Sequence, residues 1–268
     1  MGRFLLFFTV LLMIVGCKHP REVKFQPQLV VHCLLQTGSL PRRAKINHSY
    51  VLQEPFDSVF SGASIQIRSK NNIWNLSYLV GDMYQSAESV VVNEGDTFHI
   101  VVAHPEFDTV TGQTVVPGGF TIRFPGPGDT VSMSDSMVWT RSQNCRGYFM
   151  SFRQILSQDT FHIDFLIPND SFSPNYDTTW VKLPRMFFLY LVAPPPDSPP
   201  KPCTLHLWAL DTNYYIWSAA GGLVAGGQTV QDSCRLQGGL GVFGSVVKRF
   251  VPVFVRADTS PPPRRKTR

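Results

Sequence analysis

The chain has 268 residues, 20 of them glycine and 21 proline, and a formal charge of +5. This length suffices for one large β domain or two small ones, and a core of that size needs no metal or disulfide framework. Aromatic and β-branched residues are plentiful and helix formers are sparse. The composition therefore favours an all-β body of short strands over a mainly helical protein.

The positive charge is confined to the ends of the chain. Of the 24 Lys and Arg residues, Arg3 lies in the signal described below, and Arg264, Arg265, Lys266 and Arg268 lie in the last five positions. The other 19 balance the 19 acids, so the charge does not favour nucleic-acid binding. Residues 259–268 are polar and proline-rich, which predicts a disordered basic tail. Two interpretations of this tail stay open. It contacts anionic lipid head groups or an acidic partner, or it is simply a solvated end of the chain.

Residues 1–16 have the layout of a bacterial lipoprotein signal peptide, followed by Cys17. A short charged start precedes an apolar run from Phe4 to Val15, and Gly16 leads to the cysteine. A dozen apolar residues are too few for the ~20 of a membrane-spanning helix. We expect cleavage before Cys17 and a diacylglycerol on its thiol. An ordinary secretory peptide or an uncleaved anchor is the alternative interpretation.

Residues 17–27 are polar and predict a tether to the membrane. No second apolar stretch of spanning length follows, so we expect a soluble body anchored through its lipidated end. Lys18 replaces the Asp that retains lipoproteins in the inner membrane. The expected location is the outer membrane, and its periplasmic and cell-surface faces both stay open.

A first β domain is predicted over residues 28–117. The turn Asn93-Glu94-Gly95-Asp96 and similar signals separate strands at intervals of about ten residues. Such spacing favours an antiparallel sandwich of the immunoglobulin-like or transthyretin-like kind. The expected strands are 29–35, 44–51, 63–67, 73–78, 97–102 and 108–116.

A second antiparallel β domain with one short helix is predicted over residues 118–258. Asp211 can cap a helix over residues 211–220, and Gly221-Gly222 can end it. The helix carries Tyr214 and Trp217 at helical spacing, which predicts an aromatic face packed on the core. A surface loop is expected from Pro194 to Pro202. The expected strands are 120–124, 137–141, 147–155, 160–167, 178–182, 185–192 and 204–210.

Four glycines, Gly238, Gly239, Gly241 and Gly244, punctuate the segment before Val246-Val247. They match the dinucleotide pattern Gly-x-Gly-x-x-Gly in form, but no strand-turn-helix unit surrounds them, and no Lys-Ser or Lys-Thr of a phosphate loop follows. We interpret the glycines as structural, serving positive φ or a close backbone approach at a bulged strand. No cofactor is expected.

The four cysteines other than Cys17 are too far apart for a zinc or redox motif. An exported chain meets an oxidising compartment, so a bridge such as Cys203 to Cys234 can form. Three full pairings stay open. Cys33, inside an apolar strand, is expected to be a buried small hydrophobe. His32 beside it is expected to be a core or edge histidine.

The Gly-Gly-Leu-Gly-Val-Phe-Gly segment near the end of a lipoprotein resembles an uncharacterised family of Bacteroidota outer-membrane lipoproteins. Residues 233–237 depart from the family, whose members show a Ser-Asn-Ile-Glu-like approach to the glycines. The resemblance implies an accessory role beside a TonB-dependent transporter and implies no catalytic residue. Its other matching segments are 29–35, 61–65, 93–98, 114–117 and 214–220.

The sequence favours binding over catalysis, because Gly-x-Ser-x-Gly and His-Glu-x-x-His are both absent. His99 and His104, near Glu106 and Asp108, are the best metal candidates, and surface polarity explains them equally well. The leading hypothesis is a non-catalytic binding or assembly accessory. Exposed Trp74, Tyr78 and Tyr84 on one face would favour a glycan or peptide ligand. The alternative is a glycosidase-like hydrolase that uses carboxylates in a cleft between the two domains. Carboxylate pairs such as Asp129 with Asp135 and Asp159 with Asp164 are loop or strand-edge residues and give this alternative no positive support.

Overall fold

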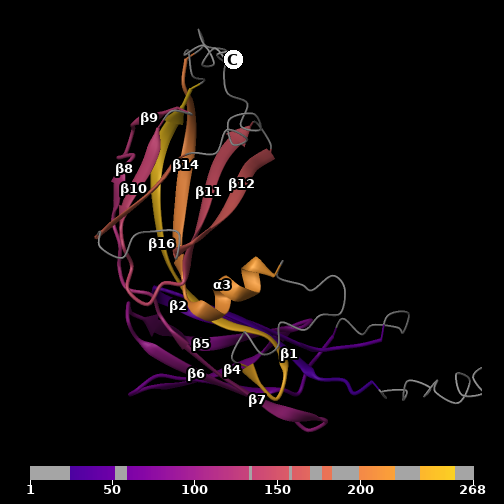
Figure 1. The fold of residues 1–268 in the computed structure, drawn as a ribbon. Helices are drawn as coiled ribbons and strands as arrows, with labels where there is room; N and C mark the ends of the chain where they lie inside the picture. The colour runs from indigo at the N-terminus through magenta and orange to yellow at the C-terminus, as the bar shows by residue number, and fades with distance from the viewer. Residues whose placement is uncertain are drawn as a thin grey trace, which may run out of the picture.

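The computed structural model confirms a mainly β protein with one short helix among the residues that it describes (Figure 1). Those residues are 25–51, 59–132, 135–156, 159–169, 177–182, 199–220 and 236–256, and for 155–156 and 159–164 the backbone alone is described. The lipidation site Cys17, the signal peptide, the predicted strand 185–192 and the basic tail lie outside them.

The strands divide between two arms that meet at a bend, a lower and an upper arm in Figure 1. The elements are β1 (Leu29–Gln36), β2 (Gly38–His48), β3 (Ser64–Arg68), β4 (Ile73–Val80), β5 (Met83–Val92), β6 (Thr97–His104), β7 (Phe107–Val115), β8 (Ile122–Phe124), β9 (Thr130–Val131), β10 (Ser136–Thr140), β11 (Gly147–Leu156), β12 (Asp159–Pro168), β13 (Thr178–Lys182), β14 (Lys201–Leu210), α3 (Thr212–Ala219), β15 (Leu236–Gln237) and β16 (Leu240–Val255).

The lower arm is one curled sheet in the order β16-β1-β2-β5-β4-β3-β6-β7-β15. Its pairings are antiparallel except for β1, which runs parallel to β16. The curl brings β7 against β16, so the arm closes around a common core. Every second residue of β1 is buried, beginning with Leu29, and the alternate residues are half-buried. The predicted buried strand is therefore buried on one face only.

The upper arm is a sandwich of two sheets. One is β12-β11-β14 with the second half of β16, and the other is β13-β10-β8. Trp139 on β10 is fully buried and meets Tyr148 on β11 edge to face, with 5.2 Å between ring centroids. Two large aromatic rings in such an arrangement add directional contacts to a core made mostly by apolar burial.

Strand β16 belongs to both arms. Its residues 240–246 pair with β1 in the lower arm, and its residues 246–255 pair with β14 in the upper arm. The predicted boundary at residue 117 lies between β7 and β8, where the chain passes from one arm to the other. Residues 236–246, assigned to the second domain from the sequence, return to the lower arm. The single strand β16 therefore runs through both arms and links them within one continuous sheet.

Three local predictions need correction. Strand β2 runs from Gly38 to His48 and not over residues 44–51, although the Ser49 N–H still donates to the Gln28 carbonyl at 2.8 Å beyond its end. Strand β14 begins at Lys201, so Pro202 is a strand residue opposite Phe254 and not part of a loop. Strand β5, whose residues 85–89 are mostly polar, was not predicted.

Candidate functional site at the junction of the arms

The helix α3 lies in the bend between the arms, and its start confirms the predicted cap (Figure 1). Asp211 has an extended backbone, and its side chain accepts a hydrogen bond from the Tyr214 N–H at 2.9 Å. An N-cap carboxylate satisfies one of the N–H groups that the first turn leaves without a helical partner. Tyr214 and Trp217 are half-buried and stack at 5.4 Å, so the predicted aromatic face is less enclosed than a core.

Asp211 also accepts a hydrogen bond from the first of two linked hydroxyls, and the three residues come from three separate segments. The Thr114 hydroxyl on β7 donates to Asp211 Oδ2 at 2.7 Å, and Ser245 Oγ on β16 lies 2.7 Å from Thr114 Oγ1. A hydroxyl has one hydrogen, and Thr114 gives its hydrogen to the carboxylate, so the Ser245 hydrogen is shared between Thr114 Oγ1 and the Val115 carbonyl, which lies 3.2 Å from Ser245 Oγ. All three residues are buried. The network joins the lower arm, the helix cap and the strand that enters the upper arm.

Asn213 adds a second bridge at the same place. Its buried amide donates to the Gln113 carbonyl at 2.7 Å and to the Phe243 carbonyl at 2.8 Å, using both hydrogens. Those carbonyls belong to β7 and β16. The first turn of α3 is therefore bonded to both strands through two of its side chains.

The environment of Asp211 penalises its charge. Removal from water raises the pKa of its carboxyl above the ordinary value, and hydrogen bonds from Thr114 and from backbone N–H groups oppose that rise. A cavity of about 320 Å³ opens beside it. Its lining residues are Gln113, Thr114, Val115, Asn144, Cys145, Arg146, Asp211, Thr212 and Asn213.

The described lining of this cavity contains one carboxylate, Asp211. A glycosidase needs two, about 5 to 10 Å apart, and one of them must be able to take part in proton transfer. Asp129 and Asp135 instead accept backbone N–H bonds of 2.7 Å in their own turns, from Gly126 and Ser132. Asp159 and Asp164 lie on β12, where only the backbone is described. The cavity does not present the carboxylate pair that the hydrolase hypothesis requires.

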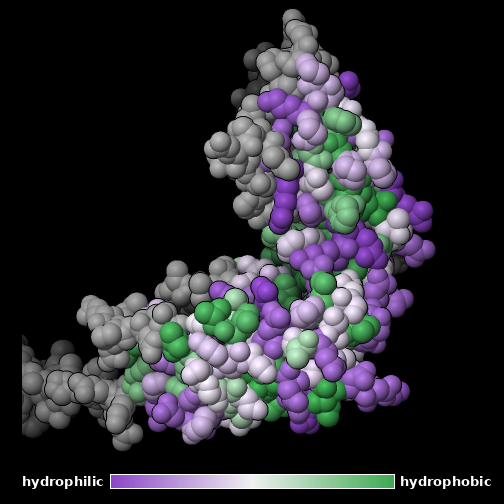
Figure 2. All heavy atoms as spheres, turned by 180° about the vertical axis from the view of Figure 1, so that it is seen from behind, coloured by the Kyte–Doolittle hydropathy of each residue, from purple (hydrophilic) through white to green (hydrophobic). Residues whose placement is uncertain are grey.

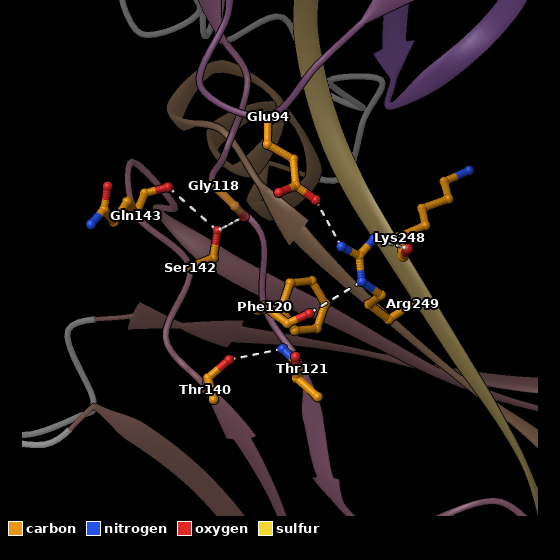
Figure 3. Close-up of polar contacts among 9 residues, drawn as sticks. All are labelled: Glu94, Gly118, Phe120, Thr121, Thr140, Ser142, Gln143, Lys248 and Arg249. Carbon is orange, nitrogen blue, oxygen red and sulfur yellow. Dashed lines mark hydrogen bonds and ion pairs between the residues drawn. The ribbon is translucent and has the colours of Figure 1, made fainter.

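An ion pair joins the arms at a second place (Figure 3). Arg249 on β16 donates to Glu94 in the β5–β6 turn at 2.7 Å, and its Nε donates to the Phe120 carbonyl at 3.1 Å. Phe120 lies in the segment between β7 and β8, and the guanidinium lies 5.7 Å from the centre of its ring. Nearby, the Ser142 hydroxyl donates to the Gly118 carbonyl of the same segment. The bend is thus held from the lower arm, the connecting segment and the upper arm together.

The glycine motif has the structural role predicted for it. Gly238 and Gly241 have φ of +82° and +101°, and a Cβ on Gly241 would overlap the Val31 carbonyl oxygen. A Cβ on Gly239 would lie 2.7 Å from the Leu29 carbonyl oxygen, and one on Gly244 would lie 2.7 Å from Tyr214 Cβ. The glycines therefore let β16 approach β1 and α3 closely. The positive φ values and close contacts explain the four glycines without a nucleotide-binding role.

The described cysteines are all buried, as predicted for Cys33. Cys203 is a free buried thiol, as are Cys33 and Cys145, and Cys234 lies outside the described residues. The structure therefore does not support the Cys203–Cys234 bridge. Burial raises the pKa of the Cys33 and Cys203 thiols to about 12 and that of Cys145 to about 11. Such thiols remain protonated and unreactive at neutral pH.

The predicted metal residues do not converge, and no group of metal-ligating side chains occurs among the described residues. His104 Nδ1 accepts from the Glu106 N–H at 3.2 Å, so its Nε2 carries the hydrogen and donates to the Ser61 carbonyl at 3.2 Å. Both ring nitrogens are thereby engaged. His99 is exposed on β6 opposite Arg68, whose positive charge disfavours a bound cation.

The predicted aromatic platform is not formed. Tyr84 is 1% exposed, and its hydroxyl donates to the Phe60 carbonyl and accepts from the Ala63 N–H. Trp74 is half-buried and packs near Phe98. Tyr78 alone of the three is well exposed. The glycan or peptide site proposed on these residues is therefore wrong.

The sequence interpretation overlooked an exposed apolar strip on the second half of β16, which we define as Phe250, Pro252 and Phe254. Phe250 is 70% exposed, while Val251, Val253 and Val255 between and beyond these residues are buried. Alternation along the strand carries this signal, because successive side chains of a strand point to opposite faces. Beside the strip, the Lys248 ammonium lies 3.9 Å from the centre of the Trp208 ring, and burial lowers the pKa of this lysine.

Among the described residues, no helix has the length and apolar character needed to cross a bilayer. No protein-family model matches the chain, and no curated protein matches it at a significant level.

The chain has distant similarity to several solved structures. The chain is similar to IG1 and IG2 of DIP-gamma, at 7% identity and a TM-score of 0.21, over 87% of this chain and 98% of that one. It is similar to three N-terminal domains of the Hoc capsid protein of bacteriophage RB49, at 6% identity and a TM-score of 0.26, over 87% of this chain and 71% of that one. It is also similar to fibronectin(III)-like modules of Clostridium thermocellum CbhA, at 7% identity and a TM-score of 0.20, over 89% of this chain and 100% of that one. Similarity at this level carries no functional information.

Proposed function

We propose that the protein is a non-catalytic outer-membrane lipoprotein, anchored by an acylated Cys17, that acts as a binding or assembly accessory to a TonB-dependent transporter. The lipoprotein signal in residues 1–17 supports the anchor. The order of motifs that resembles the Bacteroidota lipoproteins supports the partner. In this account the two arms hold binding surfaces at a fixed angle beside the membrane.

The exposed strip on β16 is the observation that carries the binding role. Phe250 and Phe254 lie on the outer face of a strand whose inner face is core, with Lys248 on the same face. Exposed aromatic side chains on a rigid strand give contact area at low entropic cost, and aromatic residues dominate the energetics of many interfaces. The strip is the surface that we assign to the transporter partner.

Affinity purification from detergent-solubilised outer membranes tests this proposal. The full-length wild type should recover an integral outer-membrane protein, and the double variant Phe250→Ser/Phe254→Ser should lose roughly tenfold or more of it. Trp180→Ser is the matched control, because Trp180 is 64% exposed but lies on β13 of the other sheet. Recovery of no partner by the wild type, or equal recovery by all three proteins, would refute the assignment.

Lipidation is measured separately in the same cells. Labelled palmitate should enter the wild type, and Cys17→Ala should abolish both the label and membrane retention. If the chain carries the palmitate label but recovers no partner, the result would support the lipid anchor and contradict the accessory role.

A further inference from the structure

Exposed apolar side chains gather at the end of the lower arm where the described chain begins. We call these residues the entry patch: Phe25, Tyr50, Val51, Val59, Leu79 and Val80. Each is between 39% and 59% exposed. Figure 1 shows the first described residues, in indigo, at the end of the lower arm that points away from the upper arm.

Backbone hydrogen bonds hold the parts of the entry patch together. The Ser49 N–H donates to the Gln28 carbonyl at 2.8 Å, which places residues 49–51 beside the start of β1. The Phe60 N–H donates to the Gly81 carbonyl at 2.9 Å, which places residue 59 beside the β4–β5 turn. The Ile46 N–H donates to the Asp82 carbonyl at 2.8 Å and joins the two groups. Figure 2 has apolar atoms, in green, toward this end of the lower arm.

Packed rings support the entry patch from within. Phe60 is buried and lies 5.5 Å from the His48 ring and 5.9 Å from the Phe107 ring. Phe107 belongs to the strand that follows the β6–β7 turn, so three separate segments share this support. The exposed side chains therefore stand on a fixed base and need little ordering on binding.

The anchor restricts how far this end can lie from a membrane. Cys17 precedes Phe25 by eight residues. At 3.3 to 3.6 Å per residue, that tether extends to about 29 Å at most. It contains Lys18, Arg21 and Lys24 and one acid, Glu22. A bilayer is thus the one large apolar phase that the tether keeps within reach of the patch.

We propose that the entry patch inserts into the interface of a phospholipid bilayer and sets the orientation of the two arms on the membrane. This inference rests on the proposed lipid anchor. Aliphatic side chains with Tyr and Phe suit the boundary between head groups and acyl chains, where an aromatic ring can bury its body and keep its polar end wet. Asp82, Glu106 and Asp108 lie at the same end, so apolar contact and not anionic lipid drives the insertion.

Vesicle flotation tests the proposal with the full mature chain carrying Cys17→Ser, so that no acyl chain contributes. One set of vesicles is pure phosphatidylcholine, and the other mixes phosphatidylethanolamine with phosphatidylglycerol. We expect the protein to float with both sets. The variant Leu79→Ser/Val80→Ser should lower the partition coefficient roughly tenfold, because two aliphatic side chains leave the interface.

The matched control is Ile73→Ser. Ile73 is 60% exposed and Val80 is 59% exposed, and the two lie at opposite ends of the same strand, β4. The control should float like the unsubstituted chain. Circular dichroism melting checks that each variant folds, and Val59→Ser replaces the double variant if that one unfolds.

Two outcomes overturn the inference. In the first, the double variant floats as well as the control, or the unsubstituted chain floats with neither set. In the second, flotation requires phosphatidylglycerol and disappears in high salt, which assigns it to the basic tether. Neither outcome touches the partner assignment, because Phe250→Ser/Phe254→Ser should float normally while losing the transporter.

Discussion

The Thr114 hydroxyl donates to the Asp211 carboxylate at 2.7 Å and so fastens β7 of the lower arm to the cap of the only described helix. Ser245 extends the bond to β16, the strand shared by both arms. A buried, fully bonded network of this kind fixes one arrangement of the packed segments. The angle between the arms is therefore part of the fold, and surfaces on each arm keep a fixed relation to one another.

Asp211 gives this junction a definite pH dependence. Burial raises the folded-state pKa of its carboxyl, so the stability that its protonated form contributes is complete below the unfolded value of about 4 and is lost as pH rises through the folded pKa. In Asp211→Asn that loss should vanish while the cap remains. Urea denaturation from acidic to neutral pH measures this. An unchanged pH slope in Asp211→Asn would contradict it.

Comparing Asp211→Ala with Asp211→Asn distinguishes the contribution of the Asp211 hydrogen bonds from that of its carboxylate charge. This variant removes the acceptor for the Thr114 hydroxyl and the Tyr214 N–H, so it should lower the free energy of unfolding by about 2 kcal/mol or more at neutral pH. Asp211→Asn should lose much less. Equal losses in the two variants would mean that the carboxylate charge, and not the hydrogen bonds, holds the junction.

Gly241→Ala should be among the most damaging single changes in the lower arm. The position combines φ of +101° with a Cβ that would overlap the Val31 carbonyl. Backbone strain and the clash together should lower the free energy of unfolding by about 3 kcal/mol or more. Gly95→Ala is the control, because Gly95 has φ of +81° but no atom within 4 Å of the added Cβ. That variant should lose about 1 to 2 kcal/mol from backbone strain alone. An equal loss in the two variants would mean that the overlap with the Val31 carbonyl does not contribute.

The Glu94–Arg249 pair should contribute little by itself. Its side chains are 42% and 39% exposed, and exposed ion pairs couple by at most about 1 kcal/mol. A double-mutant cycle with Glu94→Ala and Arg249→Ala should return a coupling in that range that falls with salt. Arg249→Ala alone should cost more than Glu94→Ala, because it also removes the bond to the Phe120 carbonyl. A coupling well above this range would make the ion pair the principal fastening.

The three described cysteines should react slowly with thiol reagents in the native protein and quickly after unfolding. Their thiols are buried, with pKa raised to about 11 or 12. Mass spectrometry of the alkylated, unreduced, denatured chain counts the free thiols. An unmodified Cys203 in that experiment would restore the bridge to Cys234 that the sequence suggested.

Local chemistry made part of this fold predictable. The cap at Asp211, the turn at Asn93–Asp96 and the role of Gly241 follow from signals within a few residues of each other. The Thr114–Asp211–Ser245 network joins residues that are far apart in the chain, and no local pattern reports such a pairing. Strand β5 was not predicted because its polar residues interrupt the alternation of apolar side chains.

The exposed strip on β16 shows a different limit. Phe250 and Phe254 alternate with buried valines, so the strand pattern was present in the sequence, but alternation does not say which face is the core. Tyr84 illustrates the converse, since an aromatic residue expected on the surface supplies a buried hydroxyl with two partners. Packing between distant segments decided both cases.

A photo-crosslinking residue placed at Phe250 in intact cells tests the central claim most directly, with the same residue at Trp180 as the reference. The account predicts one discrete crosslinked outer-membrane protein from position 250 and none from position 180. The same products from both positions, or no product from position 250 in cells that carry the lipidated protein, would contradict it.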